Sequence, residues 1–365
     1  MPEISEHYTL NMMTLSPLHV GSGRDLLRDY DYVVHRGRTW RVDEDALFDA
    51  AMGDADFDAA LIGRPAVELL QEDDYRPGSD FFRYVVKGMP RSQREGAQLS
   101  EQIKDAFNRP YLPGSSLKGA FRTAVFDWAL AQNPRALDTD RLKQSRNWVA
   151  QPIERSVLGR DPNHDLLRAL HVADSAPLDP DDALTIENAQ VVTGKKTGSP
   201  VELEALRPEV RLRTTVKIDL ALFTDQAEQE LRMGDKLSWL RDLMGLCRAR
   251  VTPILAAEQA WFARNYPGSP VAAFYSQLHQ LVKEMRDERC LLQVGWGGGW
   301  HSKTVGPRLS ERQKEDVIRS YRLARGRRGR GDPFPSSRRV ALDRQGQPVA
   351  PFGWLLIEMK REGDR

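Results

Sequence analysis

The stretch Tyr111-Leu-Pro-Gly-Ser-Ser-Leu-Lys-Gly-Ala-Phe-Arg-Thr123 predicts a turn followed by a helix, which one of its two serines caps and which runs to about Gln132. Proline and glycine break the preceding element, and the apolar residues from Leu117 to Trp128 recur at helical spacing on one face. The first turn of a helix has free N–H groups and a partial positive charge. The segment therefore predicts a helix start that favours anions.

Two cations lie in the first two turns of this helix, where the helix dipole disfavours them by about 0.3–1 kcal/mol each. Their position is explained if a phosphate group is held there by the N–H groups, the serine hydroxyls and the cations together. We therefore predict a phosphate site formed by Ser115, Ser116, Lys118 and Arg122. The alternative is a capped helix whose cations pair with nearby carboxylates, and the residues alone leave both open.

A glycine-bearing loop, His19-Val-Gly-Ser-Gly-Arg24, follows the first predicted strand. Glycines let a backbone approach a ligand closely, and the hydroxyl and guanidinium beside them can bind phosphate or ribose. The candidate residues for such a site are His19, Gly21, Ser22, Gly23 and Arg24. The loop lacks the GxGxxG helix start of a dinucleotide site. His19 could act as a general base, but a lone histidine at a strand end is more often structural.

A second glycine-rich segment is Gly295-Trp-Gly-Gly-Gly-Trp-His-Ser-Lys-Thr304. Its N–H groups, hydroxyls and lysine suit phosphate, and its tryptophans can stack on bases, a contact worth about 1–3 kcal/mol per base. The candidate residues for phosphate contact and base stacking are Gly297, Gly298, Gly299, Trp300 and Lys303. The GxxxxGK[ST] spacing of a P-loop is absent. The alternative is a glycine hinge with core tryptophans.

Charge is distributed unevenly, although the net charge is only +1. Residues 43–80 hold 12 acidic residues against 2 arginines, whereas residues 301–339 hold 12 lysines and arginines against 4 acidic residues. Such asymmetry is typical of an electrostatic partner site. In the basic segment, the candidates for phosphate contacts are Arg325, Arg327, Arg328 and Arg330. The alternatives are two solvated faces of opposite charge and a disordered solubilising loop.

Strand and helix patterns are mixed in both halves of the chain, which predicts an α+β fold. Period-two or apolar runs predict strands at 8–15, 167–173, 184–192, 210–220, 291–294 and 352–359, and a hairpin of 30–34 with 39–42. Helices are expected from 43 to about 71 and at 99–107, 226–250 and 271–288, with another that Thr252 caps and Pro253 begins. Residues 73–96 are predicted to be a loop or insertion.

Composition disfavours several classes of protein. No run approaches the ~18 apolar residues of a membrane span, and we expect no export signal, so a cytoplasmic protein is predicted. Cys247 and Cys290 lie in apolar surroundings, which predicts two buried thiols and no disulfide. No Cys/His cluster has zinc-ligand spacing, and the 7 histidines are scattered. We expect no metal, no cofactor and no catalytic residue.

Four segments together resemble the RAMP superfamily of CRISPR proteins. They are residues 14–23, residues 105–123, Leu170-His-Val-Ala-Asp-Ser175 and the glycine-rich segment before Lys303-Thr304, and the closing Pro351-Phe-Gly-Trp354 fits as well. In order and spacing they are similar to the family of fifth subunits of the type III-A Csm effector complex. The resemblance spans nearly the whole chain, and residues 105–123 are its most specific part.

The resemblance implies two ferredoxin-like (RNA-recognition-like) domains with helical insertions, placed at residues 1–178 and 179–365, the second with a helical insert at 226–288. It implies a non-catalytic subunit that binds CRISPR RNA (crRNA), caps the backbone filament at the crRNA 3′ end and supports crRNA maturation. The implied partners are crRNA, the backbone filament subunit, the small subunit and host exoribonucleases, with no membrane. The implied RNA contacts are the three segments at 19–24, 115–122 and 297–303.

Two enzymatic alternatives remain open. A metal-independent RAMP endoribonuclease that processes crRNA would use His19 or His301 as its base. A backbone-type subunit would cut target RNA with Asp25 or Asp29 and a divalent metal, because related backbone subunits carry a cleaving aspartate after the first strand. The residues around Asp25, Asp29 and Asp31 do not match that pattern, so we assign no cleavage to them.

Overall fold

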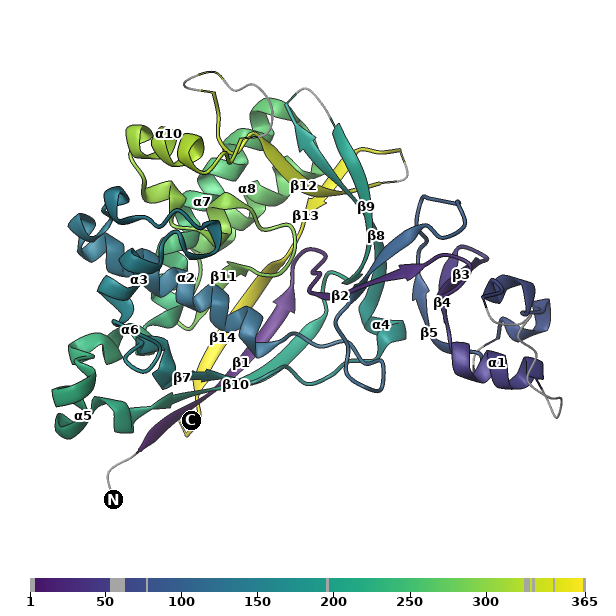
Figure 1. Ribbon diagram of the computed structural model, residues 1–365, viewed down its shortest axis with the longest axis horizontal. Coiled ribbons are helices and arrows are strands. Elements are labelled where there is room, and N and C mark those ends of the chain that lie inside the picture. Colours follow the sequence, from purple (N-terminus) through teal and green to yellow (C-terminus); the bar gives the residue numbers. More distant parts are fainter. Residues whose placement is uncertain are drawn as a thin grey trace.

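The computed structural model describes residues 4–52, 63–76, 78–194, 197–324, 329, 332–343 and 345–363. The strands form two sheets, and most helices gather beside the smaller sheet, at the end of the molecule opposite α1 (Figure 1). Every helix in the described ranges is too short or too polar to cross a membrane.

The smaller sheet has five strands and is antiparallel throughout. In spatial order they are β11 (Arg289–Gln293), β14 (Trp354–Arg361), β1 (Ser5–Thr14), β10 (Arg211–Asp219) and β7 (Leu170–Val172). The predicted period of two is confirmed in β10, where Leu212, Val216 and Ile218 are buried while Arg211 and Arg213 are exposed. Alternation thus turns one face of this sheet toward the core.

The larger sheet has nine strands. Along its main path lie β2 (Gly21–Leu27), β6 (Gln98–Gln102), β9 (Thr197–Leu206), β8 (Leu184–Thr193), β5 (Phe82–Lys87), β4 (Arg38–Val42) and β3 (Tyr32–His35). β12 (Ser337–Leu342) pairs with β8 and with β13 (Pro348–Pro351). β3 and β4 form the predicted hairpin, whereas β2 is an exposed strand at one edge of the sheet.

Both sheets take strands from either side of residue 178. β1 pairs with β10 and β14, and β6 pairs with β9. The predicted α+β class is confirmed by these two sheets and the helices packed on them. The division of the chain at residue 178 stays a prediction.

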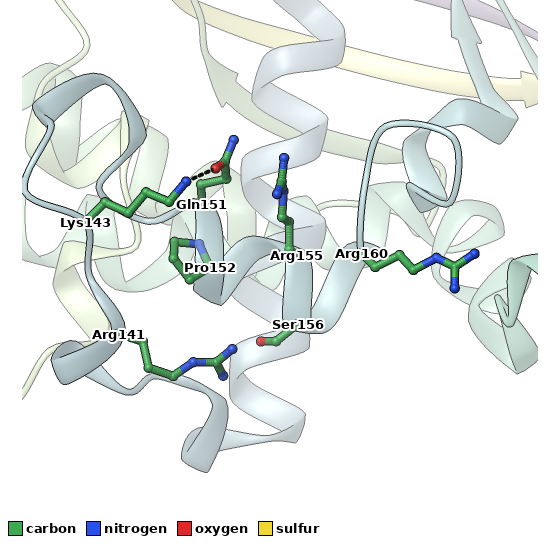
Figure 2. A pocket seen from close by; sticks show the side chains of 7 residues that line it. All are labelled: Arg141, Lys143, Gln151, Pro152, Arg155, Ser156 and Arg160. Carbon is green, nitrogen blue, oxygen red and sulfur yellow. Dashed lines mark hydrogen bonds between the residues drawn. The ribbon is translucent and has the colours of Figure 1, made fainter.

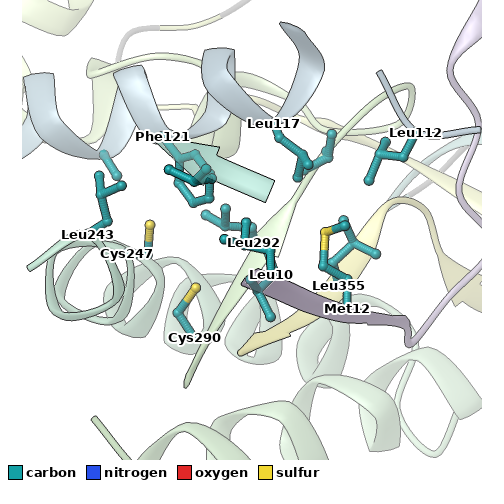
Figure 3. Packing of buried hydrophobic residues seen from close by; sticks show 14 of the residues in the cluster. Leu10, Met12, Leu112, Leu117, Phe121, Leu243, Cys247, Cys290, Leu292 and Leu355 are labelled. Atoms are coloured by element: carbon teal, nitrogen blue, oxygen red, sulfur yellow. The ribbon is translucent and has the colours of Figure 1, made fainter. Parts of the chain in front are cut away.

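The helices are α1 (Glu44–Met52), α2 (Gly114–Gln132), α3 (Gln151–Leu158), α4 (Pro180–Ala183), α5 (Asp225–Leu231), α6 (Leu237–Arg241), α7 (Leu243–Asn265), α8 (Pro270–Lys283), α9 (Trp300–Lys303) and α10 (Glu311–Ser320). On one side of the smaller sheet, Leu117 and Phe121 of α2 share a core with Leu10 and Leu355 (Figure 3). Trp354, next to Leu355, packs instead with α7 and α8. The sheet is therefore covered on both faces at β14 and β11, whereas β10 buries only one face.

Cys247 of α7 and Cys290 of β11 are both buried and free, as predicted (Figure 3). Burial raises the pKa of the Cys290 thiol, and the neighbouring Cys247 adds to this. Both thiols act as small apolar core groups.

Three segments are strands where the sequence predicted otherwise, and one is the glycine-bearing loop, whose residues 21–24 belong to β2. The helix expected at 99–107 is wrong, because Gln98–Gln102 forms β6 between β2 and β9. The loop expected at 73–96 is wrong in its middle, because Phe82–Lys87 forms β5 beside β4 and buries Tyr84 and Val86. At β5 and β6, pairing with strands from elsewhere in the sequence overrides the local pattern.

The helical region differs from the prediction at Pro253, which lies inside α7 instead of beginning a helix. Buried residues on both sides of the proline, Val251 and Ile254, hold the helix together, and the Thr252 hydroxyl donates to the Arg248 carbonyl instead of capping. In the acidic stretch, α1 ends at Met52 and short 3-10 turns follow at Ala66–Glu68 and Glu72–Asp74; residues 53–62 lie outside the described ranges.

Candidate nucleic-acid interface

The start of α2 is docked against the end of β7. Pro113, not a serine, is the N-cap residue, and the Gly114 N–H donates to Asp174 Oδ1 at 2.7 Å. The Leu112 N–H donates to Ser175 Oγ at 2.9 Å. A side chain at Gly114 would collide with the Val172 carbonyl. The serine cap is therefore wrong, and a carboxylate of the chain itself neutralises the first turn of the helix.

The two cations of α2 have different surroundings. Arg122 donates to Glu154 Oε1 at 2.6 Å and to both Asp165 oxygens at 2.8 and 2.6 Å, which is the carboxylate pairing that the sequence left open. Lys118 is partly buried and makes no ion pair with any described residue. Burial lowers the pKa of its ammonium, an effect that Asp165 opposes. Of the two, Lys118 is the one left available to an anion.

His19 is enclosed rather than presented. Its side chain is buried, its Nδ1 donates to the Glu204 carbonyl at 2.6 Å, and its backbone carbonyl accepts from the Trp296 N–H at 2.7 Å. Burial lowers the pKa of the imidazole. His19 therefore joins the first loop to the glycine-rich segment. The two bonded residues, His19 and Trp296, are 277 positions apart in the sequence.

The rest of the first loop lies on the exposed edge strand β2. Ladder pairing between β2 and β6 is irregular between Gly21 and Asp25, so Ser22, Gly23 and Arg24 project at the edge. Ser22 Oγ donates to Glu101 at 2.8 Å, and Arg24 pairs with Asp31 at 2.6 Å. The exposed edge offers polar groups, but both of these side chains already have partners.

The glycines of the second segment are explained largely by close packing. Gly295 and Gly297 have φ angles of 74° and 95°, a region that side chains disfavour. A Cβ on Gly295 would collide with the His19 carbonyl, and one on Gly297 would lie 2.5 Å from Phe352 Cβ. Gly298 is buried against Gln293 and Lys303, whereas Gly299 is exposed with open space around it. The loop is a folded junction, not a free phosphate cradle.

A buried arginine holds the short helix that follows this loop. Arg250 of α7 pairs with Asp127 of α2 at 3.0 Å, and its Nη2 donates to the carbonyls of His301, Ser302 and Thr304 at 3.0, 3.1 and 2.9 Å. Arg308 also binds Asp127, at 2.6 Å. This network fixes α9, and with it Trp300 and Lys303, relative to α2.

A cavity of about 520 Å³ lies between α2, α3, α9 and α10, and we call it the aromatic cavity. Three sequence-predicted residues from two distant segments, Arg122, Trp300 and Lys303, line it together. Its other lining residues are Thr123, Phe126, Leu137, Thr139, Leu142, Arg146, Asn147, Trp148, Val149, Ala150, Gln151, Ile153, Glu154, Thr304, Val305, Gly306, Leu309, Val317, Tyr321 and Leu323. Aromatic and apolar walls with cations at intervals can accommodate an unstacked base and its phosphate.

Some cations and aromatic rings that line the aromatic cavity are exposed and could contact a ligand. Lys303 is exposed and makes no ion pair within the described residues, and partial desolvation with the nearby Arg339 lowers the pKa of its ammonium. Trp148 is 57% exposed, a large value for a tryptophan. Trp300 packs edge to face on Phe334 at 5.0 Å between ring centroids. An exposed aromatic ring and a lysine without an ion pair among the described residues, both lining one cavity, suit the bases and phosphates of single-stranded RNA.

Trp148, Arg146 and Tyr321 were missed by the sequence analysis. Trp148 follows Arg146 by two residues. An aromatic residue so close to a cation in the sequence is typical of RNA-binding segments and could have indicated these two residues. Arg325, Arg327, Arg328 and Arg330 lie outside the described residues.

The groups invoked by the enzymatic alternatives have structural partners. His301 Nδ1 lies 2.7 Å from Glu258 Oε1, and Glu258 also binds Arg338. Asp25 accepts from Ser100 Oγ at 2.9 Å, and Asp31 accepts from Arg24. Among the residues that the structure describes, no three His, Cys, Asp or Glu side chains are grouped to hold a metal ion.

The sequence profile of the RAMP superfamily matches residues 11–244, and the chain belongs to this superfamily. The architecture is consistent with two ferredoxin-like domains. The predicted superfamily is thus confirmed.

Within the superfamily, the chain is similar to proteins named CRISPR system Cms protein Csm5. The one from Streptococcus thermophilus is 25% identical over 240 residues, 60% of this chain and 65% of that protein, so the match spans just under two thirds of that relative. The one from Methanocaldococcus jannaschii is 23% identical over 381 residues, 94% of this chain and 87% of that protein. The predicted resemblance to the fifth Csm subunit is confirmed.

Two solved structures agree with these relatives. A chain in the cryo-EM structure of a Csm–crRNA–target RNA ternary complex of a type III-A CRISPR-Cas system has a TM-score of 0.73 and 25% identity, covering 97% of this chain and all of that chain. The crystal structure of T. onnurineus Csm5 has a TM-score of 0.64 and 24% identity over 94% of this chain and 99% of that chain, and it supports the fold.

Proposed function

We propose that this chain is a cytoplasmic, non-catalytic crRNA-binding subunit of a type III-A Csm effector complex. The observation that carries the proposal is the aromatic cavity, which Trp148, Trp300 and Lys303 line. Every base has a face that can stack on an aromatic ring, and an ammonium beside the ring can bind the adjoining phosphate. Such a site holds single-stranded RNA without reading its sequence.

The similarity to a chain of a Csm–crRNA–target RNA complex supports crRNA and other Csm subunits as partners. We place the chain at the crRNA 3′ end, where it caps the filament of backbone subunits, contacts the small subunit and supports maturation by host exoribonucleases. A strand that ends at the aromatic cavity has an unpaired terminal segment, and this is the part of an RNA that aromatic stacking suits.

Several of the RNA contacts predicted from the sequence are kept in this proposal, but their roles differ. Lys118 and Lys303 carry the phosphate contacts, because both are without an ion pair among the described residues. Arg122 orients α2 against α3 through its bonds to Glu154 and Asp165. Ser115 is exposed at the start of α2, and Ser22 and Arg24 extend the surface along β2.

The test is the RNA content of the Csm complex purified with a variant subunit. Trp148→Ala with Lys303→Ala should lower the crRNA retained per complex, most strongly at high salt, and should broaden the distribution of crRNA 3′ ends. Phe107→Ala with Arg264→Ala is the matched control, because it removes one exposed ring and one exposed cation that do not line the aromatic cavity. Unchanged RNA content and unchanged 3′ ends in the first variant would contradict the proposal.

Absence of catalysis is tested on the pure protein with repeat RNA, with and without a divalent metal. Intact RNA is expected, because His19 is enclosed and His301 is paired with Glu258. Cleavage that disappears in His19→Ala or His301→Ala would establish the endoribonuclease instead. Metal-dependent cleavage lost in Asp25→Ala or Asp29→Ala would establish the backbone-type activity.

A further inference from the structure

A second concave site lies on the outer side of α3, away from the core. It has a volume of about 450 Å³ and is lined by Arg141, Lys143, Gln151, Pro152, Arg155, Ser156 and Arg160, and we call it the basic pocket (Figure 2). Four of these lining residues are cations and none is acidic. No residue of the basic pocket other than Gln151 lines the aromatic cavity, and the sequence analysis assigned none of them a role.

Three of the four cations of the basic pocket have no acidic partner among the described residues. The side chains of Arg141 and Arg155 are exposed and make no hydrogen bond or ion pair with any described residue, and Lys143 is bonded to the neutral Gln151. Arg160 differs, because it pairs with Glu230 at 3.2 Å and points away from the others (Figure 2). Like charges gathered without carboxylates repel one another, whereas the chain as a whole has nearly equal numbers of the two signs. A bound anion would relieve that repulsion.

The basic pocket adjoins the aromatic cavity at one shared lining residue. Gln151, in the first turn of α3, lines both, and Arg155 follows one helical turn later, about 6 Å further along the helix axis. Arg141 and Lys143 approach the same helix from the neighbouring loop (Figure 2). A strand that leaves the aromatic cavity past Gln151 therefore meets these three cations next.

We propose that Arg141, Lys143 and Arg155 bind the phosphates of the RNA segment adjoining the nucleotide held in the aromatic cavity. This inference rests on the proposed function and extends the binding path by a second site. An acidic protein segment would also carry negative charge, but the lining of the basic pocket offers no aromatic or large aliphatic anchor of the kind that protein partners use. Cations alone suit a phosphate backbone, and the lining residue Gln151, which the basic pocket shares with the aromatic cavity, favours RNA.

The test compares two triple variants of the full-length chain in binding to fluorescent single-stranded RNA. Arg141→Ala/Lys143→Ala/Arg155→Ala removes the proposed contacts. Arg264→Ala/Lys283→Ala/Arg286→Ala removes three exposed cations that line neither site, so the change in net charge is the same. Thermal unfolding confirms that both variants are folded. Each is titrated with an RNA of about 12 nucleotides, which can span both sites, and with a dinucleotide, which fills only the aromatic cavity.

The proposed variant should bind the longer RNA about tenfold more weakly than the control variant, since three exposed charge pairs of modest strength are lost. The slope of log affinity against log salt should become shallower by about 2, because each phosphate contact on a single strand contributes about 0.7. Binding of the dinucleotide should be unchanged. Poly-glutamate should compete poorly with the RNA.

Three outcomes would overturn the inference while the proposed function stands: equal binding by the two variants, an equal loss for the dinucleotide, or efficient competition by poly-glutamate. If the wild-type chain and the assembled complex bind neither RNA, the proposed function itself fails. The two failures are thus distinguished in one set of titrations.

Discussion

Arg250 of α7 and Asp127 of α2 form a buried ion pair, with Nη1 of the arginine 3.0 Å from Oδ1 of the aspartate. Neither side chain lines the aromatic cavity, yet the same guanidinium donates to three carbonyls at α9, the helix that carries Trp300 and Lys303. The pair therefore sets the geometry of the proposed RNA site from behind it.

Arg250→Met should destabilise the fold by about 3–5 kcal/mol. It leaves the buried Asp127 with one fewer positive partner, and it leaves the carbonyls at α9 without their hydrogen-bond donor. The free energy of unfolding in urea measures this. Arg264→Met, an exposed position on the same helix, should change it by less than about 0.5 kcal/mol. Equal stabilities of the two variants would show that the Arg250 network does not fix α9.

Two glycines of the same loop should respond differently to alanine. Gly297→Ala should lower the free energy of unfolding by about 2 kcal/mol or more, because φ is 95° and the new methyl group meets Phe352. Gly299→Ala should be nearly neutral, since this residue has an extended backbone and open space around it. A neutral Gly297→Ala whose RNA binding is lost would mean that the glycine serves RNA contact rather than packing.

Trp148→Ala should weaken binding of single-stranded RNA by about 1–3 kcal/mol, the value of one base–aromatic stack, while Trp148→Phe should retain much of the affinity. Because this side chain is 57% exposed, the thermal midpoint should barely move. Phe107→Ala, at 76% exposure, controls for loss of an exposed ring outside the cavity. Fluorescence titration at fixed salt compares the three variants, and equal affinities would remove Trp148 from the site.

Glu187 of β8 should make stability fall with rising pH. Burial raises the pKa of this carboxyl from 4.5 to about 7. Below pH 4.5 both the folded and unfolded states are protonated, so its stabilising effect is complete; between pH 4.5 and 7 the unfolded state ionises first, and about 3 kcal/mol is lost. Above pH 7 both states are ionised and the loss stops.

Glu187→Gln isolates that effect. Urea unfolding at pH 4.5 and 7.5 should show a larger decline for the wild type than for the variant, by about 3 kcal/mol. Parallel declines would show that Glu187 ionises in the folded state as it does in the unfolded chain.

Local patterns predicted the elements whose neighbours in space do not alter them. The alternation of β10, the β3–β4 hairpin and the end of α2 at Gln132 follow from periodicity and turn residues. β6 could not be predicted in this way, because its partners β2 and β9 are distant in sequence. Pro253 lies within α7 because packing on both sides of it outweighs its preference for a helix start.

The residue types of the candidate site could be predicted from the sequence, but the partners with which these residues form ion pairs and close contacts could not. Lys118, Trp300 and Lys303 could be named because their residue types and spacing suit RNA. The partners of Arg122, namely Glu154 and Asp165, are 32 and 43 positions away and are brought to it only by the fold. The glycines beside His19 and Phe352 are required by close contacts between segments that are distant in the sequence, so no local pattern predicts them.

Crosslinking of the assembled Csm complex tests the central claim most directly. The complex is prepared with crRNA that carries photoreactive 4-thiouridine near its 3′ end, irradiated, digested and analysed by mass spectrometry for RNA-linked peptides of this chain. We predict crosslinks to the segment around Trp148 and to the segment around Trp300, both of which line the aromatic cavity, and their loss in Trp148→Ala/Lys303→Ala. Crosslinks confined to other parts of the chain, unchanged in that variant, would contradict RNA binding at this site.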